Sequence, residues 1–214
     1  MLTAAQVRQR LRESEGALEY AEALAALCTE HGFTMVGKEG LTLRGAVLIQ
    51  QSRQRDALAL AESTILDSMG IAGAWRLLLV EAYGSIGRFE EAFAQLDIVR
   101  WLAEQRGFGL VSANVAITEA NLLIKQSGAA SYGAAERILR KAITVAQSQD
   151  AKLFELRASA RLAGILAAQG RSGEAHAILS PSYGWFSEGF ETADLRDARV
   201  LLEMLGDSIE TAGH

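Results

Sequence analysis

The 214-residue chain has a formal net charge of −5, and 50% of its residues are hydrophobic. This length and composition can close a core as one large domain or as two small ones. The negative charge argues against a dedicated surface for nucleic acid or for an anionic membrane, because both require clustered lysine and arginine.

Cysteine usage and hydropathy favour a cytoplasmic location. The single cysteine, Cys28, cannot form an internal disulfide. No charged start followed by an apolar run resembles a signal peptide. No stretch approaches the roughly 18 consecutive apolar residues that a membrane-spanning helix requires.

The distribution of glycine predicts a chain of helices separated by short turns. There are 20 glycines and one proline, and no segment alternates with the period of two that marks a strand. Glycines fall where one apolar-periodic segment stops and the next starts, as in SIGRFEEA and AAQGRSGEA. This placement is typical of helix C-caps, so we expect an all-α fold.

The first predicted unit, residues 3–32, is an incomplete helix hairpin. The segment ALEYAEALAALCTEHGF (17–33) has the pattern of a second helix, whereas residues 3–12 match a first helix poorly. We expect either an atypical N-terminal cap or a piece of a longer protein. Cys28 falls at an inner spacing of its helix, which predicts a buried side chain.

Four hairpins are predicted next, at residues 34–69, 72–106, 109–149 and 152–186. The turns at Gly87 and Gly170 are equivalent, and GAASYG lengthens the turn of the unit that starts at 109. The equivalent positions Gly45, Val80, Ala120 and Ala163 are 35, 40 and 43 residues apart.

Small residues recur in these units where two antiparallel helices must approach closely. We therefore expect Gly45 to face Ala57 and Ala163 to face Ala175. Each hairpin keeps an apolar face that it cannot cover alone, so stacking on the next hairpin buries that face.

The C-terminal segment is predicted to close the stack. Pro181 falls inside or ends a helix over 172–186, and Thr192 can N-cap a last helix over 192–206. We expect this helix and four aromatic residues to cover the last hairpin: Tyr183, Trp185, Phe186 and Phe190. Trp75 and Trp101 are expected in the core.

The spacing of several residues resembles the tetratricopeptide repeat (TPR) family. The best-matching unit carries Leu79, Tyr83, Gly87, Phe89 and Ala92. The resemblance implies a right-handed α-solenoid of about four to five repeats, in one domain, plus the C-terminal helix. It also implies a concave groove, lined by the first helix of each hairpin, that receives peptides. The groove positions of this chain are Glu39, Thr42, Gln50, Glu81, Ser85, Asn114, Asn121, Lys125 and Arg157.

Within this set, Asn114, Asn121 and Lys125 are seven and four residues apart, so they share one helical face. Together with Arg157 they can bind a peptide: an Asn amide can hydrogen-bond the peptide backbone, and Lys125 or Arg157 can pair with an acidic group. The alternative is a solvated polar face without a ligand. Ile117 stands where the family's carboxylate clamp has a lysine, which disfavours a receptor for chaperone tails.

The region from about Ala17 to Leu205 is also similar to a narrower bacterial group. In these large proteins a C-terminal helical-repeat region follows a signal-transduction ATPase joined to a class III nucleotide-cyclase or transcription-factor-like domain. The resemblance rests on AKLFELRASARLAGILAAQGRSGEA and on SPSYGWFSEGFETADLRDARVLLEML. It implies a regulatory arm, and no catalytic residue comes with it.

No catalytic or cofactor motif accompanies the repeats. The chain has no GxxxxGK[ST] phosphate loop, and its three histidines lack metal-ligand spacing. Glu90 and Glu91 are better explained as partners of a helix N-terminus than as an acid–base pair. We therefore expect neither a cofactor, nor a metal, nor an enzyme.

Two functions remain open at this point. The leading hypothesis is a protein–protein interaction or scaffold module in bacterial signal transduction, which binds a peptide, a partner protein or a domain of its own parent chain. The alternative is a small-effector sensor arm that controls a linked cyclase or ATPase. Pairing of two copies into a homodimer also stays open.

Overall fold

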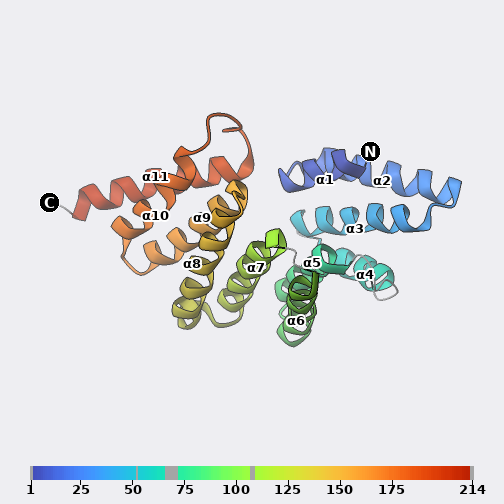
Figure 1. Cartoon of the computed structure of the whole chain (residues 1–214), viewed down its shortest axis with the longest axis horizontal. Coiled ribbons are helices and arrows are strands. Elements are labelled where there is room, and N and C mark those ends of the chain that lie inside the picture. Colours follow the sequence, from blue (N-terminus) through green and yellow to red (C-terminus); the bar gives the residue numbers. More distant parts are fainter. Residues whose placement is uncertain (1, 52, 66–71, 107–108, 213–214) are drawn as a thin grey trace. The chain divides into compact units, whose positions relative to one another are not determined.

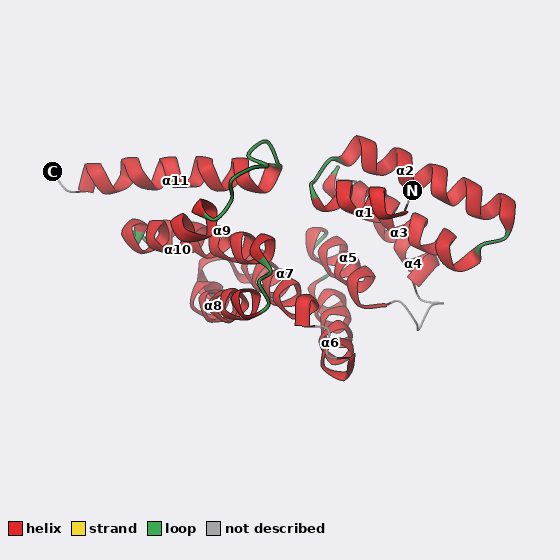
Figure 2. Cartoon of the chain, turned by 45° about the horizontal axis from the view of Figure 1, so that its top comes forward, coloured by secondary structure: helices red, strands yellow, loops and turns green. Residues whose placement is uncertain are grey.

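The computed structural model describes residues 2–51, 53–65, 72–106 and 109–212, and within these ranges every regular element is a helix (Figure 2). The chain is an all-α solenoid of antiparallel helix hairpins, which confirms the predicted fold class. Its contacts divide it into two compact units, Met1–Leu102 and Ala103–His214. Each unit is described below by itself.

The first unit contains three pairs of successive helices (Figure 1). Helix α3 packs against α1 and α5 as well as against its own partner α4. The helices are α1 (Leu2–Arg10), α2 (Ser14–His31), α3 (Thr34–Gln50), α4 (Gln54–Ile65), α5 (Ala72–Ser85) and α6 (Phe89–Arg106), whose last residues extend past Leu102.

The second unit contains two hairpins and a final helix. Helix α9 packs against α7 and α11, which places α7, α9 and α11 in one layer, here called the first-helix layer. Helices α8 and α10 pack against this layer. Helix α8 contacts α7 and α9, and helix α10 contacts α9 and α11. The helices are α7 (Gly109–Ser127), α8 (Tyr132–Ser148), α9 (Lys152–Ala168), α10 (Ser172–Gly184) and α11 (Ala193–Ala212).

The first four residues of the inserted sequence GAASYG form a single 3-10 turn, η1 (Gly128–Ser131), and the last two begin α8. The Ser131 hydroxyl donates to the Gly128 carbonyl at 2.7 Å, and Gly128 has a φ of 54°. The turn therefore lengthens this connection without disturbing either helix.

The turns at Gly87 and Gly170 have the same backbone structure, as their sequences predict. Both glycines lie in the left-handed region, with φ of 81° and 75°. The amide of Arg88 donates to the Tyr83 carbonyl, and that of Arg171 to the Leu166 carbonyl, each at 2.9 Å. This six-to-one bond closes the preceding helix, and glycine adopts the required φ without a steric penalty.

Close packing within and between hairpins is visible at two glycines of α3. A Cβ added to Gly45 would lie 3.9 Å from the Ala57 carbonyl oxygen, so the expected contact between these residues is present. A Cβ added to Gly40 would lie only 3.2 Å from the Ala21 carbonyl oxygen. Gly45 thus lets α3 approach α4 within a hairpin, and Gly40 lets α3 approach α2 of the preceding hairpin.

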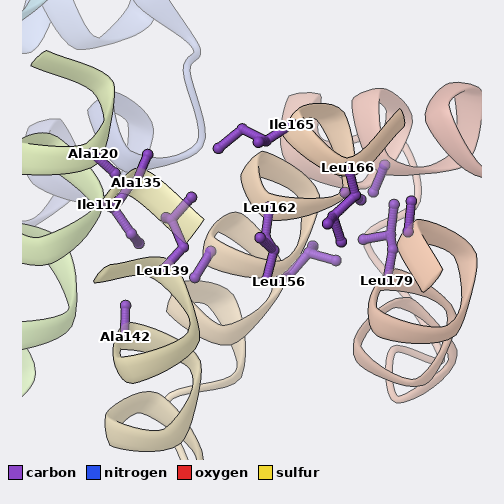
Figure 3. Close-up of a cluster of buried hydrophobic side chains, with 14 of the residues drawn as sticks. Ile117, Ala120, Ala135, Leu139, Ala142, Leu156, Leu162, Ile165, Leu166 and Leu179 are labelled. Atoms are coloured by element: carbon purple, nitrogen blue, oxygen red, sulfur yellow. The ribbon is translucent and has the colours of Figure 1, made fainter. Parts of the chain in front are cut away.

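The core of the second unit is continuous through its helices (Figure 3). Ala163 and Ala175 are both fully buried in it, and their expected contact with each other stays a prediction. Helix α9 supplies its centre, with Leu156, Leu162 and Leu166 each at most 1% exposed. The Ser159 and Ser182 hydroxyls bond to each other at 2.9 Å, which satisfies a polar pair within this core.

Cys28 is buried and carries a free thiol, as its inner spacing predicts. Trp101, by contrast, is 59% exposed, so the expectation that it packs in the core is wrong. The buried face of α6 runs through Ala92, Leu96 and Val99, and Trp101 falls outside that spacing. The side chain of Trp75 lies outside the described residues.

The C-terminal aromatic segment is only partly buried. Pro181 lies inside α10, and Tyr183 and Phe186 pack against the core of the second unit. Tyr183 also contacts Phe190, with ring centroids 5.9 Å apart. Trp185 is 58% exposed, so the expectation that it helps to cover the last hairpin is wrong. Trp185 follows the last residue of α10, and its ring lies edge-on to Phe186 at 5.1 Å between centroids.

An ion-pair network joins α8 to the start of α10. Glu136 accepts hydrogen bonds from Arg171 at 2.8 Å and from Arg140 at 2.9 Å, and Arg171 also pairs with Glu174. The hydrogen bonds from Arg171 and then Arg140 hold the pKa of Glu136 below its ordinary value. The network therefore favours the ionised carboxylate in the folded protein.

The close packing of α6 can be tested with a bulky side chain at Ala92, which is fully buried. We expect Ala92→Trp to lower the free energy of unfolding by about 1–3 kcal/mol, because overfilling a tight contact forces neighbouring atoms apart. Denaturant unfolding followed by circular dichroism measures this change. Ala94→Trp is the matched control, since Ala94 is exposed on the same helix. Equal losses in both variants would contradict the packing described for α6.

The α8–α10 network predicts a pH dependence of stability. Because folding lowers the pKa of Glu136, its contribution is complete above the ordinary value of 4.5 and is lost as the pH falls through the folded pKa. We expect Glu136→Gln to cost about 1 kcal/mol at pH 7, a modest amount because solvent screens the network. The stability difference from wild type should shrink as the pH falls below 4.5. Glu203→Gln, at an exposed position of α11, should show neither effect, and an unchanged difference at pH 3 would refute the role of Glu136.

Candidate functional site

The residues that the sequence nominates for ligand binding all lie on first helices of hairpins. Five of them belong to α3 and α5 in the first unit, and four belong to α7 and α9 in the second. The side chains of Glu39, Thr42 and Gln50, all on α3, lie outside the described part of the structure.

On α5, the Glu81 and Ser85 side chains are exposed near the C-terminal end of the helix. The Ser85 hydroxyl donates to the Ala82 carbonyl at 2.8 Å, which is a local bond within the last turn. These two residues supply polar atoms at one end of α5.

Helix α7 presents a polar row along one face. Asn114 and Asn121 are half-buried and Lys125 is exposed, and their spacing of seven and four keeps them on that face. Asn114 and Asn121 are also the only two asparagines of the chain. Both asparagine side chains of the chain thus lie on one side of one helix.

Asn121 carries a polar atom that the fold does not satisfy. Its Oδ1 atom is buried and has no hydrogen-bond partner among the residues that the structure describes. A buried polar atom without a partner typically costs about 1–3 kcal/mol. A buried group kept at this cost requires an explanation, and a ligand that pairs with it is one.

Arg157, nominated to hold an acidic group of a ligand, is occupied by an acid of its own chain. Its guanidinium donates to Asp194 Oδ2 through Nε at 3.1 Å and through Nη2 at 2.7 Å. Asp194 lies in the first turn of α11, so this ion pair ties α9 to the final helix. Both side chains are mostly buried, which strengthens the pair relative to a surface one.

Arg161, which the sequence analysis did not single out, lies one turn after Arg157 on the same face of α9. No carboxylate of the described residues pairs with it, and neighbouring protein lowers the pKa of its guanidinium by displacing water. Its spacing of four from Arg157 was the signal in the sequence that could have found it.

Among the residues that the structure describes, no three His, Cys, Asp or Glu side chains are grouped in a way that could hold a metal ion. Glu91 accepts a hydrogen bond from Arg88 at 2.8 Å, and this bond holds the pKa of its carboxyl below the ordinary value. An ionised, arginine-bound carboxylate at a helix start fits the structural role expected for Glu91. No helix in the described ranges has both the length and the apolar character needed to cross a membrane.

No protein-family model matches the chain, and no curated protein matches it. Solved structures do resemble it. A Rap protein complexed with competence and sporulation factor matches 97% of this chain with a TM-score of 0.61 and 12% sequence identity. The apo form of RapI matches 99% with a TM-score of 0.59, also at 12% identity. The chain spans 62% of the length of the first protein and 82% of the second, and likeness at this identity shows a shared helical-repeat fold.

The Arg157–Asp194 ion pair can be tested by charge exchange. We expect Arg157→Asp to lower the free energy of unfolding by about 1–3 kcal/mol, because it removes charged hydrogen bonds and brings two carboxylates together. Combining it with Asp194→Arg should restore most of that loss. Thermal unfolding followed by circular dichroism gives the comparison, with Arg199→Asp, at an exposed site of α11, as the control for surface charge. A double variant no more stable than Arg157→Asp alone would show that the pair does not join the two helices.

Proposed function

We propose that this chain is a non-enzymatic binding module that takes a peptide, or an extended segment of a partner protein, on the first-helix layer of its second unit. The observation that carries the proposal is the unsatisfied amide of Asn121 on the polar face of α7. An Asn amide has both a donor and an acceptor, as a peptide backbone does, so the two can pair without regard to ligand side chains.

The neighbouring charges support a peptide over an apolar ligand. Lys125 is exposed on the same face as Asn121, and Arg161 lies on α9, which packs beside α7. Four polar side chains of α7 and α9 can turn to a ligand without breaking an ion pair between described residues: Asn114, Asn121, Lys125 and Arg161. Arg157 cannot, because it is paired with Asp194. The layer thus combines a backbone-pairing amide with cations.

The fold likeness adds independent support. A Rap protein that contains this fold has been solved in complex with competence and sporulation factor. We extend ligand binding to this chain as part of the proposal. Its TPR-like repeats, and the similarity of its C-terminal sequence to regulatory regions of bacterial signalling proteins, favour a regulatory arm in the cytoplasm. In that role the module would report ligand binding to a cyclase or ATPase domain of the same parent chain.

The proposal is tested by exposing the immobilised full chain to a pool of random octapeptides and quantifying the retained peptides by mass spectrometry. We expect the wild-type chain to retain peptides and Asn121→Leu to retain at least fivefold less. The free energy of unfolding should stay equal or rise by about 1 kcal/mol, because the substitution removes a buried unsatisfied oxygen.

Gln126→Leu is the matched control, since Gln126 is exposed on the same helix five residues away and points elsewhere. Equal retention by wild type and Asn121→Leu would contradict the role of Asn121. A wild-type chain that retains no peptide, but whose melting temperature rises with a nucleotide or metabolite, would instead favour the small-effector alternative.

A further inference from the structure

Two arginines on one face of α9, Arg157 and Arg161, differ in their surroundings. Arg157 and Arg161 are four residues apart, so both project from the same side of the helix. Arg157 is held by Asp194. Arg161 has no carboxylate partner among the described residues, so the fold neutralises one of these cations and leaves the other available.

Arg161 is also partly shielded from water. The residue as a whole is exposed, yet protein atoms crowd its guanidinium enough to lower its pKa, and burial is the first cause of that change. Tyr132, at the start of α8, acts on this pKa in the opposite direction and is the second cause. A cation that has lost hydration without gaining a counter-charge is stabilised when an anion binds to it.

The surface beside Arg161 has room for a ligand backbone. Gly164 follows three residues later on the same face, and a Cβ added there would meet no atom within 4 Å. Ala168 continues the row with another small side chain. An extended chain can therefore lie against α9 next to the guanidinium.

In the repeat, the position of Gly164 on α9 corresponds to that of Asn121 on α7. Helices α7 and α9 are successive first helices that pack side by side, and the step of 43 residues makes Asn121 equivalent to Gly164. Packed helix axes lie about 8–10 Å apart, a distance that about three residues of an extended chain span at roughly 3.3 Å each.

We infer that Arg161 binds a carboxylate of the peptide ligand, about three residues from the peptide group that pairs with Asn121. This inference rests on the proposed function and adds the chemical class of the ligand, an extended peptide with an acidic group at a defined position. The carboxylate can be the C-terminus of the peptide or an Asp or Glu side chain. Arginine suits either, because its planar fork of donors matches both oxygens.

Three octapeptide pools on the full chain distinguish these sources. The first has random sequences with a free C-terminus, the second has the same sequences with an amidated C-terminus, and the third is amidated and lacks Asp and Glu. We expect the wild type to retain the first pool at least tenfold better than the third. Retention of the second pool identifies a side-chain carboxylate, and its loss identifies the C-terminus.

Variants assign the effect to Arg161. Arg161→Gln should reduce retention of the first pool to that of the third, whereas Arg161→Lys should keep part of the preference because it keeps the charge. Arg137→Gln is the matched control, since Arg137 is exposed on α8 and makes no ion pair with a described residue. Equal retention of the first pool by wild type and Arg161→Gln would overturn the inference and leave peptide binding standing. If the wild-type chain retains no pool, the proposed function fails and the inference fails with it.

Discussion

The close approach of two antiparallel helices within each hairpin is the constraint on which the rest of the structure depends. A helix end with a left-handed glycine, as at Gly87 and Gly170, reverses the chain in a few residues. Small residues such as Gly45 and Ala57 then let the two backbones come together. Because the short turn and the small contact recur, successive first helices lie side by side, as α7 and α9 do. A continuous face built from neighbouring first helices is a consequence of that repetition.

The second unit combines a well-satisfied interior with an incompletely satisfied face. Its core is apolar, its buried Ser159 and Ser182 pair with each other, and Glu136 joins two arginines between α8 and α10. Two groups are exceptions among the described residues: the Oδ1 atom of Asn121 has no hydrogen-bond partner, and the guanidinium of Arg161 has no carboxylate partner. Both belong to the first-helix layer. Both groups lie on the face that we propose binds a ligand. Ligand binding would explain why the chain keeps them although they lower its stability.

Local features could be predicted from the sequence because they depend on spacing within a few residues. The helices, the equivalent turns at Gly87 and Gly170, and the contact of Gly45 with Ala57 follow from apolar periodicity and from the position of small residues. The pairing of Arg157 with Asp194 could not be predicted, because these residues are 37 positions apart on different elements. The spacing of four places Arg161 on the same face as Arg157, but the sequence does not show which of the two lacks a carboxylate partner.

The central claim is that a peptide binds on the face of α7 that carries Asn121, and the composition of the chain makes a direct measurement available. Because Asn114 and Asn121 are its only asparagines, labelling with ¹⁵N-asparagine gives two pairs of side-chain amide signals in a nuclear magnetic resonance spectrum, one pair for each NH2 group. Substituting Asn114 assigns them. On titration with a peptide retained from the octapeptide pool, the side-chain signal of Asn121 should shift and saturate together with binding. Saturable binding that leaves the Asn121 signal unmoved would contradict the account.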